Sequence, residues 1–308
     1  MTKAMAEKRP KVEPIRQPTL FQMEKLDQAA EPGELKTERP YSLPGILLGT
    51  SAFTANGRQC SFYPPGMNSR DFLSYYATQF ATVEVDSTFY GCPAVTTVNN
   101  WAARTPEDFI FSVKIPQLIT HDKALVDCDS EFEEFVKTMD ILGPKLGPMV
   151  FQFPKFDHWK FPKPDSFLVV LEPFLKKLPA DHRFVIEIRN KTWLDARFAD
   201  VLREHNVALA LTDTSFMPRP WEMKEKVDLT TADFTYVRWL GDRKGIEKQT
   251  KTWDKVIVDR RADLLEWVDL LRKVHERRIQ ILAFANNHYA GHGPATVKLF
   301  LDLWNKEH

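Results

Sequence analysis

The sequence predicts an α/β fold of the (β/α)₈ TIM-like barrel class, preceded by a disordered tail. A short β-branched or aromatic run recurs eight times over about 265 residues, the length of one barrel, and a helical pattern follows all but one of these runs. Polar side chains gather where these runs end, and not where they begin. No junction between a run and a helix carries the glycine pattern of a dinucleotide or phosphate loop, so a doubly wound open sheet, the alternative, has less support.

Each predicted strand is a short apolar run that is bounded by turn residues. Because these strands alternate with helices, a parallel sheet is favoured. The eight strands are expected at 46–50, 83–86, 109–114, 149–153, 184–188, 207–211, 234–239 and 279–285.

Helical periodicity follows seven of these strands. Asn68 or Ser69 is expected to cap the first helix, and Ser130 with Glu133 has the spacing of a capping box. The segment 214–232 contains prolines and shows no helical period. The helices are expected at 69–79, 95–103, 130–143, 166–177, 194–205, 261–277 and 294–305.

Composition and charge fit a soluble intracellular protein. The chain has 308 residues, of which 43% are hydrophobic, and its 42 basic residues balance 42 acidic ones. This balance does not indicate a general binder of nucleic acids or membrane surfaces. Three cysteines without paired spacing indicate neither disulfides nor a thiolate zinc site. Since no apolar run approaches the roughly 20 residues that span a bilayer, and the chain starts with charges, we expect a cytoplasmic protein without a membrane partner.

Residues 1–40 are expected to form a flexible tail, and 41–308 a single barrel domain. The tail mixes charges of both signs with prolines and has no sustained apolar period. Within it, Gln17 stands three and four residues before Leu20 and Phe21. This pattern resembles the Gln-x-x-Leu-Phe peptide with which bacterial replication and repair proteins bind the sliding clamp. The two interpretations are a clamp-binding segment at 17–21 and a simple solvated tail.

The ends of the predicted strands carry the candidate functional residues, because the chemistry of a barrel lies at the carboxyl ends of its strands. In the stretch 83–90, two carboxylates stand two residues apart in an apolar run, so they share one face. We expect the acid or base among Glu84, Asp86, Glu187, Asp213 and His288, and substrate contacts from Ser51, Lys114, Gln152, Arg189, Arg238, Asn286 and Asn287.

Three cations in this set, Lys114, Arg189 and Arg238, face several acids, as an anionic substrate beside a general acid or base requires. A self-neutralising polar network is the alternative. His288 and His292 could bind zinc or manganese beside a carboxylate, but their spacing in a loop matches no metal motif. We therefore assign no metal ligand and leave the cofactor unknown. The chain has no Gly-x-Ser-x-Gly elbow and no cysteine–histidine pattern that indicates a nucleophile.

Several motifs resemble the YecE-like TIM-barrel proteins, in the order of that family and at similar spacings from about 46 to 303. The motifs are Gly49-Thr50-Ser51, Phe62-Tyr63-Pro64, the 83–90 stretch with Pro93, Trp101 with Arg104-Thr105-Pro106, Val113-Lys114 with Thr120-His121, Gln152-Phe153-Pro154, Glu187-Ile188-Arg189, Tyr236-Val237-Arg238 with Gly241, and Asn286-Asn287-His288-Tyr289 with Gly291. The resemblance implies a barrel with a polar pocket at the carboxyl ends of its strands, in a family of uncharacterised activity.

The same resemblance implies a fold relation to the TIM-barrel apurinic endonucleases and sugar isomerases. Those endonucleases use a multi-histidine zinc cluster, whereas this chain has few histidines at its strand ends. Asp86 and Ala52-Phe53 also depart from the Asn and the Gly-Trp that are common in the family.

Three hypotheses for function follow. The first is an enzyme, such as a phosphoester hydrolase, that acts on a phosphorylated or nucleic-acid-derived substrate at the carboxyl-terminal face of the barrel. The second is a non-catalytic binding or adaptor protein that holds a small polar anion or a nucleic-acid end and is tethered to a sliding clamp. The third is a metal-assisted sugar isomerase or epimerase.

Overall fold

Eight parallel strands form a nearly closed barrel in the computed structural model, which describes residues 39–223 and 227–306. Neighbouring strands follow the order β1-β8-β7-β6-β5-β4-β3-β2, and the predicted barrel class is confirmed. The strands are β1 Ile46–Thr50, β2 Thr82–Val85, β3 Ile110–Lys114, β4 Leu146–Gln152, β5 Phe184–Glu187, β6 Ala208–Thr214, β7 Phe234–Gly241 and β8 Gln280–Ala285.

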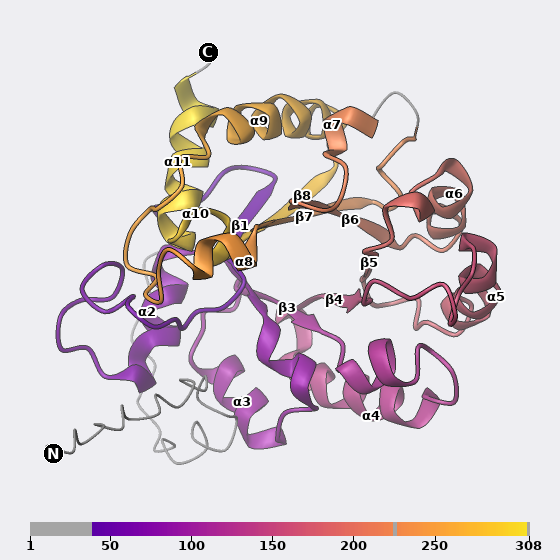
Figure 1. The fold of residues 1–308 in the computed structure, drawn as a ribbon. Helices are drawn as coiled ribbons and strands as arrows, with labels where there is room; N and C mark the ends of the chain where they lie inside the picture. Colours follow the sequence, from indigo (N-terminus) through magenta and orange to yellow (C-terminus); the bar gives the residue numbers. More distant parts are fainter. Residues whose placement is uncertain (1–38, 224–226, 307–308) are drawn as a thin grey trace, which may run out of the picture. The chain divides into compact units, whose positions relative to one another are not determined.

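Helices lie around the outside of the barrel (Figure 1), and every predicted helix is present within a few residues of its expected ends. They are α2 Phe72–Gln79, α3 Val95–Ala103, α4 Asp129–Met139, α5 Pro164–Leu175, α6 Ala196–Glu204, α7 Pro220–Met223, α8 Arg243–Glu247, α9 Arg261–Glu276, α10 Asn287–Ala290 and α11 Gly293–Lys306. Shorter helical turns are η2 Ser69–Asp71, η3 Asp86–Tyr90, η4 Leu118–Asp122, η5 Asp140–Lys145 and η6 Lys191–Trp193. None of the helices in the described ranges is long and apolar enough to cross a membrane.

The capping box predicted for Ser130 and Glu133 is wrong. Helix α4 begins one residue earlier, at Asp129, with Cys128 as its N-cap and no side-chain capping bond. Ser130 therefore lies inside the first turn, and its hydroxyl donates to the Glu131 carboxylate at 3.0 Å. An N-cap side chain must precede the first turn to reach the free amides, which explains the failure.

The barrel closes between β1 and β2 through a tyrosine hydroxyl. Gly49 of β1 lies so close to β2 that a Cβ atom would stand 2.3 Å from the carbonyl oxygen of Thr82, so only glycine fits. The Tyr76 hydroxyl of α2 accepts a hydrogen bond from the Thr50 amide at 2.8 Å and donates to the Thr82 carbonyl at 3.1 Å. One side chain thus satisfies backbone groups of both strands.

The barrel interior is apolar along most of the strands and becomes polar at their carboxyl ends, which form the mouth of the barrel. Side chains alternate along a strand, so Gln152, Glu187 and Arg238 are the next inward positions toward the carboxyl ends after the apolar core. The described core residues inside the barrel are Val150, Val185, Ala208, Ala210, Phe234, Tyr236, Leu282 and Phe284. The core therefore ends in a polar layer at the mouth, where the sequence predicts the functional residues.

The predicted clamp peptide at 17–21, and the predicted tail up to residue 38, lie outside the described residues. The described chain begins at Arg39, next to the predicted domain boundary. Arg39 donates to the Ala77 carbonyl at 2.9 Å and pairs with Asp108 through an Nη1 to Oδ2 distance of 2.7 Å. Residue 39 is therefore in contact with the barrel domain.

Candidate active site at the barrel mouth

Arg238 of β7 forms the centre of the polar layer. Its Nε and Nη2 donate to Oε1 of Glu84 at 3.1 and 2.7 Å, and Nη2 also donates to Oδ1 of Asp86 at 3.2 Å. Its Nη1 donates to Oε1 of Gln152 at 3.2 Å and to the Glu187 carboxylate. A guanidinium has five N–H donors, and here the protein uses them all. Arg238 therefore organises the site and has no donor left for a substrate.

A chain of hydrogen bonds continues from Glu84 into the core. The Tyr236 hydroxyl lies 2.6 Å from Oε2 of Glu84 and 2.6 Å from Oγ of Ser112. The Ser112 hydroxyl in turn donates to the carbonyl of Pro148 at 2.8 Å. Glu84 is fully buried, so these contacts and Arg238 satisfy both of its oxygens.

The two glutamates that share Arg238 differ in their electrostatics. Burial opposes ionisation of Glu187, but the charges of Arg238 and Arg189 outweigh burial and lower its pKa. For Glu84, burial is the largest effect and, together with the charge of Asp86, outweighs Arg238, so the pKa of Glu84 is raised. Burial alone would lower the pKa of Arg238, but the carboxylates raise it well above its ordinary value.

Asp86 and Arg189 form the solvent-facing side of this cluster, and the buried Lys114 lies beside Asp86. The side chains of Asp86 and Arg189 are each 33% exposed, and Lys114 Nζ lies 3.9 Å from Oδ1 of Asp86. Lys114 Nζ also stands 3.9 Å from the centroid of the Phe89 ring. Arg189 Nε donates to Glu187 at 3.2 Å. In the part of the chain that the structure describes, neither Lys114 Nζ nor the two terminal nitrogens of Arg189 has a hydrogen-bond acceptor, so these donors remain for an anionic ligand.

His121 of η4 lies beside these cations and was missing from the predicted site. Burial, followed by the charges of Lys114 and Arg189, lowers its pKa to about 4. Its Nδ1 lies 2.9 Å from the Thr120 hydroxyl, and its ring packs edge-on against Phe89. His121 is therefore neutral at pH 7. The Thr-His pair in the family motif was the signal that could have identified it.

The structure places Asp213 away from the Arg238 cluster, on the face of β6 that meets the helices. Its Oδ2 accepts from Trp267 Nε1 and from the Tyr289 hydroxyl, each at 2.9 Å. The other oxygen pairs with Arg219. Asp213 thus joins α9 and α10 to the barrel, and we do not include it in the acid or base set at the mouth.

Asn286 and Asn287 follow β8, and their side-chain oxygens hold helix termini. Oδ1 of Asn286 accepts from the His288 amide at 2.9 Å and caps α10. Oδ1 of Asn287 accepts from the Gly293 amide at 2.9 Å, at the start of α11, and from Arg58 Nη2 at 3.0 Å. Both residues lie at the mouth, but the oxygens of their amides are already used.

His288 and Ser51 complete the predicted set. Nε2 of His288 lies 3.1 Å from Oε1 of Glu247 in α8, and Nδ1 lies 2.6 Å from Oδ1 of Asn286. Burial is the main cause of its lowered pKa. His288 therefore joins α8 to the end of β8. The buried hydroxyl of Ser51 has no hydrogen-bond partner within the described ranges.

A second buried arginine, Arg58, was not predicted. It lies in the connection after β1, where Nη1 donates to the Ala52 carbonyl at 2.7 Å and to the Thr50 hydroxyl at 3.5 Å, and Nη2 donates to Asn287. All of these acceptors are uncharged. Burial lowers the pKa of Arg58, and no carboxylate among the described residues pairs with it.

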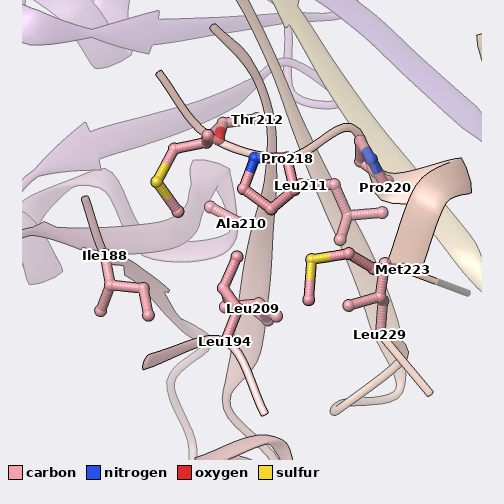
Figure 2. Close-up of a pocket in the computed structure, with 11 residues that line it drawn as sticks. Ile188, Leu194, Leu209, Ala210, Leu211, Thr212, Pro218, Pro220, Met223 and Leu229 are labelled. Atoms are coloured by element: carbon pink, nitrogen blue, oxygen red, sulfur yellow. The ribbon is translucent and has the colours of Figure 1, made fainter. Parts of the chain in front are cut away.

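Two further features of the described structure bear on where a ligand could bind. Within residues 39–223 and 227–306, no group of three or more His, Cys, Asp and Glu side chains is arranged to hold a metal ion. A separate pocket between β6 and α7 is lined mainly by apolar side chains, including Leu209, Leu211 and Met223 (Figure 2). Its volume of about 20 Å³ holds a water molecule and no organic substrate. The mouth around Arg238 is the candidate site, because the charged side chains at the strand ends meet there.

A model of a protein family of unknown function, DUF72, matches residues 47–308, which includes nearly all of the barrel and its mouth. The chain belongs to the DUF72 family. The UPF0759 protein YecE of Escherichia coli K12 is 34% identical over 119 residues, which cover 38% of this chain and 41% of YecE. The match thus spans less than half of that relative. The UPF0759 protein YunF of Bacillus subtilis is 27% identical over 278 residues, which cover 85% of this chain and 96% of YunF.

Solved structures of DUF72 proteins share the barrel. A DUF72 protein of Thermotoga maritima matches with a TM-score of 0.66 and 23% identity over 85% of this chain and 99% of that chain. A DUF72 protein of Enterococcus faecalis matches with a TM-score of 0.60 and 18% identity over 85% and 96%. At these identities the likeness shows the fold alone.

Proposed function

We propose that this DUF72 protein is an enzyme that acts on a phosphorylated or nucleic-acid-derived substrate, bound at the carboxyl ends of the strands. The proposal rests on how the hydrogen-bond donors of three cations are used. Arg238 gives all its donors to the protein, whereas Lys114 and Arg189 keep donors that face the mouth. An anionic group can bind between these two cations without disturbing the Arg238 network.

Asp86 is the carboxylate best placed to transfer a proton. It is more exposed than Glu84 and Glu187, and its Oδ1 lies 3.9 Å from Lys114 Nζ. Burial is the main cause of the lowered pKa of Lys114, so this ammonium gives up its proton more readily than an ordinary lysine. Asp86 as base and Lys114 as acid would form a proton-transfer pair at the mouth. Glu187 stays ionised and fixes the direction of Arg189.

The proton count around Glu84 supports a mouth with net positive charge. The chain Glu84, Tyr236, Ser112 and the Pro148 carbonyl has three close oxygen contacts, but the two hydroxyls supply only two protons. A proton on Glu84 supplies the third, in line with its raised pKa. Two carboxylates then remain against the cations Arg238, Lys114 and Arg189, and the single excess positive charge favours an anion.

Turnover of phosphoesters tests this function. The wild type and Asp86→Asn are incubated with a panel of phosphomonoesters and phosphodiesters, and products are followed by ³¹P NMR. The asparagine oxygen can still accept from Arg238, so binding is expected to remain while turnover falls about 100-fold or more. Arg197→Gln is the control, because Arg197 is exposed and its partner among the described residues is Asp165, on the outside of the barrel. If the wild type turns over no phosphoester in the panel, the proposed activity is wrong.

A non-catalytic binding protein is the rival function, and the saturated Arg238 network favours it, because such a network gives a rigid, preorganised pocket. Native mass spectrometry of freshly purified protein separates the two. An organic anion that copurifies and is returned unchanged after incubation would favour binding without turnover. Release of a chemically altered product would favour the enzyme.

For the segment 17–21, we propose binding to a bacterial sliding clamp through Gln17, Leu20 and Phe21. The proposal rests on the peptide pattern in the sequence alone. A pull-down with purified clamp is expected to lose the protein when Leu20 and Phe21 are both changed to alanine. Ile15→Ala is the matched control and should be retained. Equal retention of both variants would refute the interaction.

A further inference from the structure

Exposed apolar side chains collect at one end of the barrel. Among the described residues, eight large apolar side chains are exposed, and only Val169 lies in the body of an outer helix, α5. Six of the other seven lie between the carboxyl end of a strand and the first turn of the next α-helix, and Val256 lies in the connection between α8 and α9. The seven are Tyr90, Val95, Leu118, Val126, Trp159, Phe216 and Val256. Such a concentration on one face is typical of a contact surface.

Trp159 is the most exposed of them, at 96%, and its loop is firmly anchored. Phe156 and Phe161 on either side are buried, with ring centroids 4.9 Å apart. The Phe156 amide donates to Asn190 Oδ1 and its carbonyl accepts from Asn190 Nδ2, each at 2.9 Å. The loop between β4 and α5 therefore presents an indole to solvent from a fixed base. A large aromatic ring held in this way is suited to stacking on a flat ligand.

Cations stand beside the exposed aromatic rings. Lys160 follows Trp159 directly, and its Nζ lies 3.3 Å from the carbonyl oxygen of His121. The guanidinium carbon of Arg189 lies 5.9 Å from the centroid of the Phe216 ring. The connections 153–163 and 188–195, which carry Trp159 and Arg189, together contain five Lys or Arg residues and two Asp residues. This side of the mouth is therefore both aromatic and positively charged.

We propose that the rim formed by Trp159, Lys160, Arg189 and Phe216 binds single-stranded nucleic acid. Bases would stack on Trp159 and Phe216, and backbone phosphates would contact Lys160 and Arg189. A single strand fits better than a duplex, because stacking on a side chain requires unpaired bases. The interleaved cations favour nucleic acid over an apolar protein segment. The inference rests on the proposed function and names the polymer that would deliver a phosphate to Lys114 and Arg189.

Fluorescence anisotropy with a labelled oligo(dT) of about 15 nucleotides tests the rim on the full-length chain. Trp159→Ala is expected to weaken binding by about 5-fold to 100-fold, the usual cost of one lost stacking contact, while Trp159→Phe retains most of it. Lys160→Gln should weaken binding and reduce the slope of log K against log salt by about 0.7. Lys176→Gln, an exposed cation at the end of α5, is the control and should bind like the wild type.

The outcomes distinguish this inference from the proposed function. If the wild type does not bind the oligonucleotide at about 50 mM salt, or if Trp159→Ala binds as tightly as the wild type, the rim proposal is wrong. Stabilisation by small phosphorylated compounds depends on Lys114 and Arg189 and should survive Trp159→Ala, so its persistence supports the proposed function separately. The rim proposal would also be wrong if the wild type binds a protein partner that Trp159→Ala does not bind, and the wild type does not bind the oligonucleotide.

Discussion

Arg58 and Arg238 are equally buried, with 1% and 2% exposure, and both lie at the carboxyl-terminal end of the barrel, but their surroundings are opposite. Arg238 is surrounded by the carboxylates of Glu84, Asp86 and Glu187, which raise its pKa. Within residues 39–223 and 227–306, Arg58 donates to carbonyl, hydroxyl and amide oxygens and to no carboxylate, and burial lowers its pKa. One guanidinium holds charges together, whereas the other holds chain segments together.

The difference teaches what each residue would leave behind if it were removed. Removing one partner of a buried ion pair strands the other charge and is strongly destabilising. Removing a donor from neutral acceptors costs only the hydrogen bonds and the packing. The comparison also explains why Lys114 and Arg189, and not Arg238, are available to a ligand.

Arg238→Met should give the largest loss of stability. It strands the ionised carboxylates of Asp86 and Glu187 and removes the donors to Glu84, so we expect the free energy of unfolding to fall by about 3–5 kcal/mol at pH 7.5. The stranded carboxylates have raised pKa values in the folded variant, so the folded state binds more protons than the unfolded state as the pH falls. The deficit should therefore shrink at pH 5.5. Urea unfolding at both pH values measures it, and an equal deficit at both would mean that the carboxylates are not stranded.

Arg58→Met should have a smaller and less pH-dependent effect. It leaves only neutral acceptors, so the expected loss is about 1–3 kcal/mol. The same urea experiment should give similar deficits at pH 7.5 and 5.5. A deficit that changes with pH as strongly as that of Arg238→Met would show that Arg58 also neutralises an acid.

A histidine with a lowered pKa lies near each of the two arginine sites, and each histidine makes the stability of the protein depend on pH. Burial first, and then Arg58, lowers the pKa of His292 to about 4, and His121 has a pKa of about 4 beside Lys114 and Arg189. The unfolded chain takes up these protons below pH 6.5, whereas the folded chain resists until about pH 4. Stability is therefore lost as the pH falls through this window, with a slope of at most about 1.4 kcal/mol per pH unit for each proton.

Urea unfolding between pH 6.5 and 4.5 should show this loss in the wild type and a flatter profile in the His121→Asn/His292→Asn variant. His292 is more buried than His121. His292→Asn alone should therefore reduce the pH dependence of the free energy of unfolding more than His121→Asn, because solvent screens the charge of the more exposed His121. Parallel profiles for the wild type and the double variant would contradict the lowered pKa values.

Glu84→Gln should have the smallest effect, because an amide resembles a protonated carboxyl group. Its oxygen can still accept from Arg238, and its NH₂ can supply the missing proton to Tyr236. We expect a change in the free energy of unfolding below about 0.5 kcal/mol at pH 7.5, whereas Glu187→Gln, which removes an ionised partner, should cost more. Equal losses in the two variants would indicate that Glu84 is ionised.

The sequence predicts the strands and much of the polar layer, because both follow from a two-residue period. Glu187 and Arg238 are in phase with inward core residues of their strands. The same rule excludes Asp213, which is in phase with Leu209 and Leu211 on the helix-facing side of β6 and stands opposite the outward Trp239. Its position at the end of β6 places Asp213 at the carboxyl-terminal end of the barrel, but its side chain lies on the outer face of the strand.

Other features depend on contacts that no local pattern contains. Arg58 lies in a connection without periodicity, and its acceptor Asn287 is 229 positions away in the sequence. Similarly, the saturation of Arg238 depends on four side chains from three separate segments meeting in space. A cation at a strand end therefore predicts a charged site, but only the assembled barrel shows which cation still has donors for a ligand.

The most direct test is thermal stabilisation by matched compounds with and without a phosphate, namely sugar phosphates against free sugars and nucleotides against nucleosides. We expect phosphorylated members alone to raise the melting temperature of the wild type. Arg189→Gln should melt within about 2–4 °C of the wild type, because Glu187 keeps Arg238, but it should lose the ligand-induced shift. Arg197→Gln should keep both the melting temperature of the wild type and the ligand-induced shift. The proposal would be contradicted if no phosphorylated compound stabilised the wild type, or if Arg189→Gln retained the full shift.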